Sequence, residues 1–223
     1  MASCRYPTKA SLKVIMHDVV RIRFPKHDTF QYNPGQFVQI AFPQINMLAF
    51  HPLSIASASH EPMVTLYARA LGGWSTEVLR LAQAKGTEEV PILVEGPYGS
   101  ISLDVDDDIR YQMVLCVSGG IGITHCQSIA KSILKEHNCG RQLKQLRFVW
   151  VIRDMSMLKV MTPLEGISNL DSSDIELGRR PTKSEGRRNM EASFEGMVLD
   201  GFEPEPLKFV ETDIFVHRSR RRQ

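Results

Sequence analysis

Four short segments of this chain combine glycines, hydroxyl side chains and a histidine in patterns that suit the binding of phosphate groups or rings. They lie at residues 51–55 (HPLSI), 72–76 (GGWST), 95–99 (EGPYG) and 119–124 (GGIGIT). Glycine lets the backbone approach a ligand closely, and the free N–H groups at a helix start attract anions. The candidate chemistry of these segments is therefore ligand binding at backbone turns.

The glycine turn at residues 119–124 has a clear mechanism. An apolar run at residues 111–118 precedes it, and a helical pattern at residues 124–136 follows it. A glycine turn between a buried strand and a helix lets a phosphate contact the helix N-terminus. The full G-x-G-x-x-G pattern is absent, since His125 stands where its last glycine belongs, and an ordinary tight turn is an equally good interpretation.

The other segments have simple alternatives. Residues 73–76 begin a second helix, and in isolation an ordinary N-cap is their better interpretation. Residues 96–99 form a turn whose glycines leave room for a ring. His51 and Ser54 flank a proline after an apolar strand, and Ser54 can hydrogen-bond a ring nitrogen, although a lone His and Ser in a loop are more often inert.

Three further residues are candidates for ligand binding: Tyr67, Arg69 and Arg153. The alternative is that each is an ordinary exposed residue at the end of a strand. No sequence pattern indicates a metal site. The cysteines form no C-x-x-C pair, and the histidines lack ligand spacing. Cys116 lies in an apolar run and is predicted to be a small core residue.

The elements that must position these segments change in kind along the chain. Strand-forming residues occupy residues 12–24, 36–42, 63–69 and 91–94, and a helical pattern capped by Ser75 or Thr76 covers residues 75–84. Pro34 and Gly35 predict a tight turn before the second strand. Short strands at regular spacing indicate a small antiparallel β-barrel or sandwich.

The second half reads as an α/β unit. An acidic linker at residues 104–108 precedes a fully buried strand at residues 111–118, a helix at residues 124–136 and a second buried strand at residues 146–152. This order predicts a βαβ crossover in a parallel sheet. Residues 165–206 are predicted to be a flexible insertion, and residues 207–217 a last strand.

Composition excludes several classes of protein. The chain is 43% hydrophobic and 23% charged, which is ordinary for a soluble globular protein. A net charge of +2 is too weak a bias to indicate nucleic-acid binding. No stretch approaches the ~20 apolar residues that span a bilayer, so this chain by itself is expected to be soluble.

The order and spacing of these segments resemble the dehydrogenase portion of ferric reductases and NADPH oxidases. The resemblance covers residues 9–154 and rests on residues 32–36 (YNPGQ), 51–54 (HPLS), 73–75 (GWS), 95–99 (EGPYG), 119–124 (GGIGIT) and 148–154 (FVWVIRD). It implies an antiparallel FAD-binding β-barrel at residues 8–106. An incomplete Rossmann-like α/β domain that binds NAD(P)H follows at residues 107–223.

The resemblance also implies roles for the matched positions. The catalytic position is Ser54, whose hydroxyl lies near the flavin N5 in relatives. The implied cofactor-binding residues are His51, Pro52, Leu53, Ser54, Tyr67, Arg69, Gly73, Trp74, Ser75, Thr76, Gly96, Pro97, Tyr98, Gly99, Gly119, Gly120, Gly122, Thr124 and Arg153. Residues 73–76 match the segment that holds the FAD pyrophosphate, and residues 119–124 the NADPH-binding turn. Residues 96–99 match the turn beside the nicotinamide, and Arg153 the contact to the 2′-phosphate.

The implied activity is electron transfer from NADPH through FAD to a haem, ferric or oxygen acceptor. FAD and NADPH are the implied cofactors, and a membrane haem domain is the implied partner, which makes the family membrane-associated. In this chain His125 replaces the usual proline, and the later C-G-P segment and the terminal aromatic are not found. We therefore expect a fragment, a truncated product or a half that relies on a partner, with weak or absent NADPH turnover.

Two alternatives stay open. One is a soluble cytochrome-b5-reductase-type flavoprotein, although such enzymes usually have Arg-x-Tyr where this chain has His51 and Pro52. The other is a non-catalytic remnant that acts by interaction, for which the insertion at residues 165–206 and the basic tail are suited.

Overall fold

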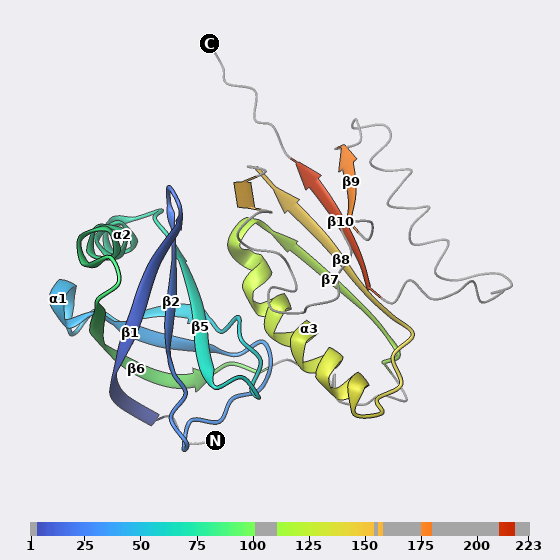
Figure 1. Cartoon of the computed structure of the whole chain (residues 1–223), viewed down its shortest axis with the longest axis horizontal. Helices are drawn as coiled ribbons and strands as arrows, with labels where there is room; N and C mark the ends of the chain where they lie inside the picture. The colour runs from blue at the N-terminus through green and yellow to red at the C-terminus, as the bar shows by residue number, and fades with distance from the viewer. Residues whose placement is uncertain (1–3, 101–110, 154–155, 158–174, 180–209, 217–223) are drawn as a thin grey trace, which may run out of the picture.

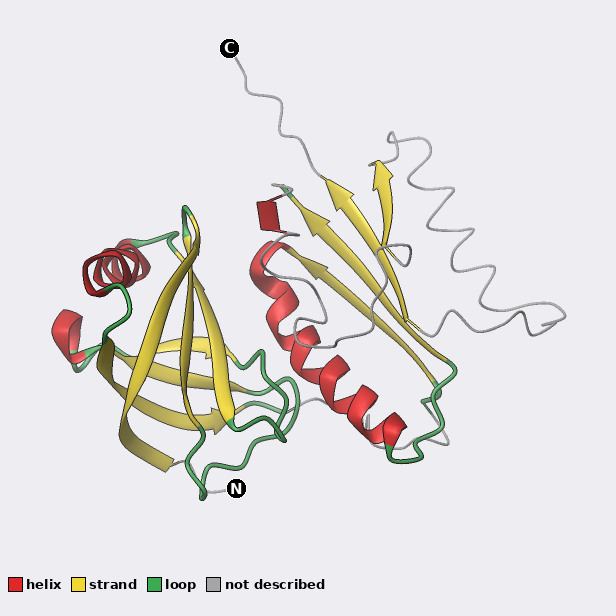
Figure 2. Cartoon of the chain, in the orientation of Figure 1, coloured by secondary structure: helices red, strands yellow, loops and turns green. Residues whose placement is uncertain are grey.

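The computed structural model describes residues 4–100, 111–153, 156–157, 175–179 and 210–216, which form two lobes (Figure 1). The first lobe is a β-structure with two helices at one end, and the second is a parallel sheet with one long helix (Figure 2). The predicted architecture, an antiparallel barrel followed by an α/β unit, is confirmed.

The first lobe is built on one six-stranded antiparallel sheet. Its strands are β1 Cys4–Met16, β2 Val19–Pro25, β3 Phe37–Ala41, β4 His51–Ser54, β5 Met63–Arg69 and β6 Glu89–Tyr98, in the order β4-β3-β6-β1-β2-β5. A bridge between Ile55 and Leu66 joins the two edges of the sheet and closes it into a barrel. Two helices accompany it: α1 Pro43–Asn46 and α2 Gly73–Lys85.

The predicted strand at residues 12–24 is wrong in one respect, because the structure divides it into β1 and β2. His17 and Asp18 form the turn between them, and the Asp18 carbonyl accepts a hydrogen bond from the Ala70 N–H at 2.7 Å. This turn contains no glycine or proline, and strand-forming Val and Ile residues flank it, so the sequence pattern did not indicate a turn here.

The predicted turn before β3 is confirmed, with the Gln36 N–H donating to the Asn33 carbonyl at 3.3 Å and Gly35 at a φ of +80°. The predicted cap of α2 is wrong, because Gly72 is the N-cap and the helix begins two residues early. Ser75 acts from inside the first turn, where its Oγ accepts from the Gly72 N–H at 3.1 Å.

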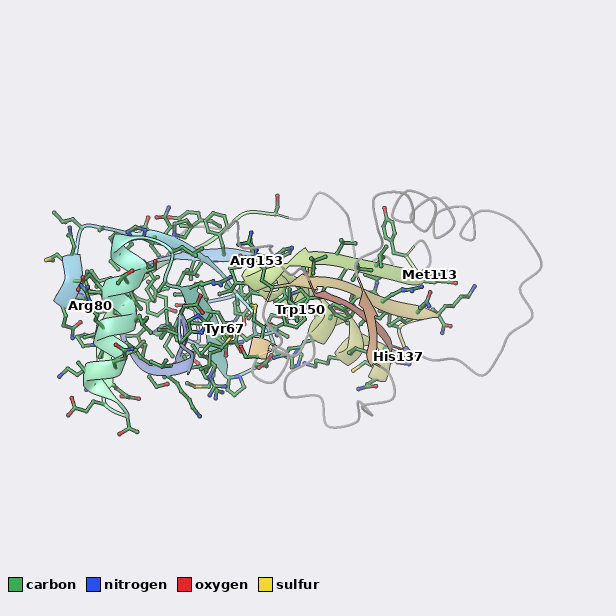
Figure 3. All side chains as sticks on the ribbon, turned by 90° about the horizontal axis from the view of Figure 1, so that it is seen from above. Tyr67, Arg80, Met113, His137, Trp150 and Arg153 are labelled. Atoms are coloured by element: carbon green, nitrogen blue, oxygen red, sulfur yellow. The ribbon has the colours of Figure 1, made fainter. Side chains whose placement is uncertain are left out.

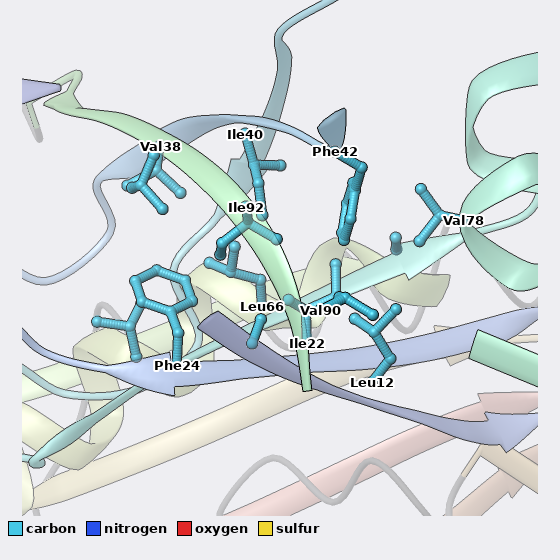
Figure 4. Close-up of a cluster of buried hydrophobic side chains, with 14 of the residues drawn as sticks. Leu12, Ile22, Phe24, Val38, Ile40, Phe42, Leu66, Val78, Val90 and Ile92 are labelled. Carbon is cyan, nitrogen blue, oxygen red and sulfur yellow. The ribbon is translucent and has the colours of Figure 1, made fainter. Parts of the chain in front are cut away.

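The barrel interior is filled by alternate residues of its strands (Figure 4). Val64, Leu66 and Ala68 all point into this core, as the sequence predicts for β5. Side chains from five other elements meet them: Leu12, Ile22, Phe24, Val38, Ile40, Val78, Val90 and Ile92. This packing gives the strands that carry the candidate residues a rigid base.

The second lobe begins with the predicted βαβ unit. It contains β7 Met113–Gly119, the 3₁₀ turn η1 Gly120–Gly122, α3 Ile123–Asn138 and β8 Gln145–Ile152. β10 Val210–Val216 pairs in parallel with β8, which confirms the predicted last strand, and β9 Ile175–Arg179 pairs in parallel with β10. The sheet order is β7-β8-β10-β9.

One prediction for this lobe is wrong, and a second is incomplete. β7 is not fully buried, since Met113, Leu115 and Val117 are 52%, 46% and 62% exposed. β7 lies at a sheet edge, where α3 covers the face that holds the buried Cys116. The insertion at residues 165–206 contains β9, whose polar and charged surroundings in the sequence gave no strand signal. The acidic linker at residues 104–108 lies outside the described residues.

None of the helices that the structure describes combines the length and the apolar character needed to cross a bilayer.

Candidate functional site

The two lobes share a buried interface. Met16, Ala56 and Tyr67 of the barrel belong to the same buried cluster as Ile123 and Cys126 of α3. Their side chains are less than a tenth exposed. The interface therefore fixes the start of α3 against the wall of the barrel formed by β1, β2 and β5.

Polar contacts reinforce this interface. The Ser128 hydroxyl on α3 donates to the Ser57 carbonyl of the barrel at 2.7 Å, and both residues are fully buried. Lys131 Nζ lies 3.2 Å from Glu61 Oε1, with side chains that are 16% and 28% exposed. Since both contacts come from successive turns of one face of α3, they also set the rotation of the helix.

The glycine turn lies directly at this boundary. Gly120 has a φ of +51°, a left-handed conformation that favours glycine, and its carbonyl accepts a hydrogen bond from Trp150 Nε1 at 2.8 Å. Trp150 is a fully buried residue of β8. Gly122 is the N-cap of α3, and no side chain caps this end of the helix. A helix N-terminus without a side-chain cap suits an anion.

Sequence reasoning missed the supporting role of Trp150. A buried Trp in a strand usually finds a partner for its N–H, which is the signal that was available. The partner itself lies thirty positions away in the sequence, so only the fold reveals it.

Arg69 brings a positive charge from the barrel to the glycine turn. It ends β5, and its guanidinium lies 4.0 Å from the position that a Cβ would occupy on Gly120. Arg69 Nε donates to Asp18 Oδ2 at 2.6 Å, which holds the side chain at 26% exposure. The structure thus places a cation and an uncapped helix N-terminus together. Tyr67 lies two residues earlier on the same strand and is buried.

Ser54 and the GPYG turn are brought together by the barrel. Ser54, at the end of β4, pairs with Phe37 of β3, and Phe37 also pairs with Tyr98 of β6. Ser54 is half-buried, and the Phe37 and Tyr98 rings lie 5.7 Å apart. These candidate residues come from three neighbouring strands at one end of the sheet.

The glycines of the GPYG turn have a packing role. Gly96, at a φ of +145°, has Val38 Cγ1 3.3 Å from the position of a Cβ. Gly99, at a φ of +82°, has the Phe37 ring 3.2 Å away. In this structure the ring that lies against Gly99 is that of Phe37. Pro97 lies between them and is half-buried.

The start of α2 is open. No atom lies within 4 Å of the Cβ positions of Gly72 and Gly73. Trp74 stacks on His51, with ring centroids 4.1 Å apart and planes 22° apart. Trp74 Nε1 is buried and has no hydrogen-bond partner among the described residues. The strand β4 that carries His51 continues through an exposed Pro52 and a half-buried Leu53.

The remaining candidates gather at the carboxyl ends of β7 and β8. Gly119 pairs with Val151, and Arg153 follows two residues later as an exposed side chain beside the boundary of the lobes (Figure 3). Space around Gly119 and Gly122 is open. Thr124, by contrast, is only 5% exposed, so its side chain belongs to the packed base of the turn.

These features fit two phosphate-bearing cofactors. The start of α2 offers open glycines and the orphaned Trp74 N–H, while the start of α3 offers open glycines and the Arg69 cation. A closed antiparallel barrel joined to a parallel α/β lobe, with a helix N-terminus suited to phosphate on each, defines a flavoprotein of the ferredoxin-reductase type.

Comparison with known proteins gives the family. Residues 5–102 match the model of an FAD-binding domain, and residues 111–196 match that of the ferric reductase NAD binding domain, so the two together cover most of the chain. The chain therefore belongs to the ferric reductase-type oxidoreductases, with an FAD-binding domain followed by an NAD(P)-binding domain.

Similar proteins agree with this assignment. The chain is 30% identical to NADPH oxidase 1 of Mus musculus over 75% of its own length and 28% of that protein. It is 28% identical to probable ferric reduction oxidase 1 of Arabidopsis thaliana, over 75% of this chain and 25% of that protein. The chain thus spans about a quarter of the length of these relatives.

The fold also matches solved structures. A ferredoxin NADP⁺ reductase from Neisseria gonorrhoeae, solved with bound FAD and NADP, aligns with a TM-score of 0.61 at 13% identity. The alignment covers 94% of this chain and 84% of that one, and it confirms the fold alone.

Proposed function

We propose that the barrel of this chain binds FAD, that its glycine turn binds NADPH, and that electrons pass from NADPH through FAD to a haem, ferric or oxygen acceptor. The observation that carries this proposal is the position of Arg69, because a barrel residue beside Gly120 makes the two cofactor regions neighbours. Bound FAD supplies the chemistry that divides a two-electron donor into single electrons.

The residues of the barrel would hold and orient FAD. Open space beside Gly72 and Gly73 at the start of α2 suits its pyrophosphate, and the stacked rings of Trp74 and His51 lie next to this helix start. Ser54, half-buried at the end of β4, is proposed to hydrogen-bond the flavin N5 and to be the catalytic residue.

The residues of the second lobe would hold NADPH. Gly119, Gly120 and Gly122 leave space at the start of α3 for a pyrophosphate, and Trp150 keeps the turn in place. Arg153 is exposed beside that turn and is proposed to bind the 2′-phosphate, which favours NADPH over NADH. The Gly96–Gly99 turn is proposed to lie beside the nicotinamide.

We also propose the division into a barrel domain at residues 8–106 and a nucleotide-binding domain at residues 107–223. The two family models match on either side of residues 103–110, which supports it. Since the chain spans about a quarter of its oxidase and reductase relatives, a membrane haem domain remains the proposed partner.

FAD titration of the purified chain tests the barrel site. We expect a shift of the flavin absorbance and quenching of its fluorescence on binding. A second titration with NADP⁺ tests the glycine turn, where Arg69→Ala should weaken binding by roughly tenfold or more, because it removes the cation beside Gly120 that can contact a phosphate. Asp18→Asn is the matched control, since it keeps the cation and removes only its ion-pair partner. FAD that stays spectrally unchanged would sink the proposal.

A further inference from the structure

Two thiols and an imidazole meet at the start of α3. Cys116 of β7 and Cys126 of α3 are 6% and 4% exposed, and both are free thiols. Both side chains belong to one buried cluster, in which β7 packs against α3. His125, the neighbour of Cys126, brings its Nε2 to 3.5 Å from the Cys126 sulfur.

This arrangement divides the roles of the two cysteines. The hydrogen bond from Cys116 lowers the pKa of Cys126 below its ordinary value, and the contact with His125 lowers it further. The same hydrogen bond, together with burial, raises the pKa of Cys116, and the bond to Cys126 raises the pKa of His125. The two shifts have opposite directions, so they favour the thiolate at Cys126 and the protonated thiol at Cys116.

We propose that Cys116 and Cys126 are a redox-sensitive dithiol, which hydrogen peroxide converts into a disulfide between β7 and the first turn of α3. A thiolate near a cation and a helix N-terminus is the usual reactive form of cysteine, and a resolving thiol lies in contact with it. The proposal concerns this chain's own residues and does not depend on cofactor binding.

The chemistry balances with peroxide as the oxidant. The Cys126 thiolate attacks one oxygen of the peroxide, the O–O bond breaks, and a sulfenic acid forms while the departing hydroxide takes a proton from His125 and leaves as water. The Cys116 sulfur then attacks the Cys126 sulfur, the S–O bond breaks, and a second water carries away the Cys116 proton. Two thiols lose two electrons and the peroxide gains them.

The position of the pair gives the reaction a local consequence. The disulfide would close a loop that contains Gly119, Gly120 and Gly122, so it would restrict the turn at the boundary of the two lobes. Burial of both sulfurs selects a small, neutral oxidant over bulky disulfide reagents. Cys139, which is exposed, provides an internal reference in the same chain.

Mass spectrometry of the folded, full chain tests the proposal. Trypsin cuts after Arg110 and Lys131, so Cys116 and Cys126 lie on one peptide, while Cys139 lies on another. After brief peroxide treatment and alkylation, we expect the first peptide to lose two hydrogens and to carry no alkyl group. Cys139 should remain alkylated. Oxidised glutathione should leave the first peptide reduced.

Variants then separate the roles. Cys116→Ser should leave a Cys126 sulfenic acid that dimedone traps, whereas Cys126→Ser should give roughly tenfold less dimedone label at Cys116. His125→Ala should slow the peroxide reaction by several fold. The proposal is overturned if Cys139 oxidises while the first peptide stays alkylatable, or if Cys126 advances to sulfinic acid without loss of two hydrogens. The wild-type measurement decides even if a variant fails to fold.

Discussion

Tyr32 shows how one buried hydroxyl links two loops of the barrel. It is 3% exposed, its hydroxyl donates to the Ala58 carbonyl at 2.8 Å, and it lies 2.9 Å from Ser57 Oγ. Ser57 Oγ in turn accepts from the Thr65 N–H at 3.0 Å. Burial raises the pKa of Tyr32 to about 12, because an ionised phenol would lose its water.

Tyr32→Phe should lower the free energy of unfolding by about 1–2 kcal/mol near neutral pH, because the Ala58 carbonyl loses one of its two donors and Ser57 Oγ loses its phenol partner. The wild-type advantage is complete below pH 10, where the unfolded chain keeps the phenol neutral. It is lost as pH rises from 10 towards about 12, because the unfolded phenol ionises first. Urea denaturation near pH 7 and 11 should show the advantage shrinking by about 1.4 kcal/mol.

Wild type and Tyr32→Phe share every other titrating group, so the effects of those groups cancel in the difference between the two unfolding free energies. A difference between wild type and Tyr32→Phe that stays constant from about pH 9 to about pH 11 would contradict the assigned environment of the phenol.

The helices and strands were predictable where the sequence carries local signals, such as apolar alternation or a glycine at a turn. The bounds of β5 and the turn at Pro34 and Gly35 agree with the pattern, because alternation and positive-φ glycine are local signals. The exposure of Leu115 and the strand β9 were not predictable. An unbroken apolar run does not reveal that one sheet face is uncovered, and β9 is defined by its pairing with β10.

The candidate site divides in the same way. The phosphate-binding turns at Gly73 and Gly120 carry their signal in glycine spacing, so the sequence located them. The partners that position those turns, such as Trp150 for Gly120 and Asp18 for Arg69, are distant in sequence and leave no local pattern. Their contribution depends on tertiary packing.

At the level of the elements, Trp150→Phe should release the glycine turn from β8. The Gly120 carbonyl would lose its 2.8 Å hydrogen bond, so we expect a loss of about 1–2 kcal/mol and faster amide hydrogen exchange at residues 120–123. Trp74→Phe is the matched control, because the Trp74 N–H has no partner among the described residues. Equal losses for both variants would argue against the role of Trp150.

The turn at the end of β6 gives a second prediction. Gly96→Ala should destabilise the barrel by ~1–3 kcal/mol or more, because a φ of +145° is strained for alanine and the new Cβ would lie 3.3 Å from Val38. Gly73→Ala introduces the same methyl into open space within α2 and should be neutral or slightly stabilising. Thermal unfolding of the two ligand-free variants checks the contrast.

For the whole molecule, the interface between the lobes decides whether the two cofactor regions stay neighbours. Ser57, which bonds Tyr32 inside the barrel, also accepts the Ser128 hydroxyl of α3 through its carbonyl. The same short loop therefore stabilises the barrel and seats the second lobe. The structural order of one lobe therefore depends on that of the other. If this loop opens locally, we expect both Arg69 and Gly120 to lose their fixed positions.

The ion pair across this interface provides a measurable test of that coupling. Lys131→Met and Glu61→Gln each remove one charge, and the glutamine oxygen can still accept the Ala58 N–H that Glu61 Oε1 binds at 2.8 Å. A double-mutant cycle on the free energy of unfolding should give a coupling of about 0.5–1 kcal/mol, since both side chains are partly buried. It should fall as salt rises from about 0.1 M to about 1 M, because added ions screen the pair. A coupling near zero at low salt would mean that α3 is held against the barrel by its apolar contacts and by Ser128 alone.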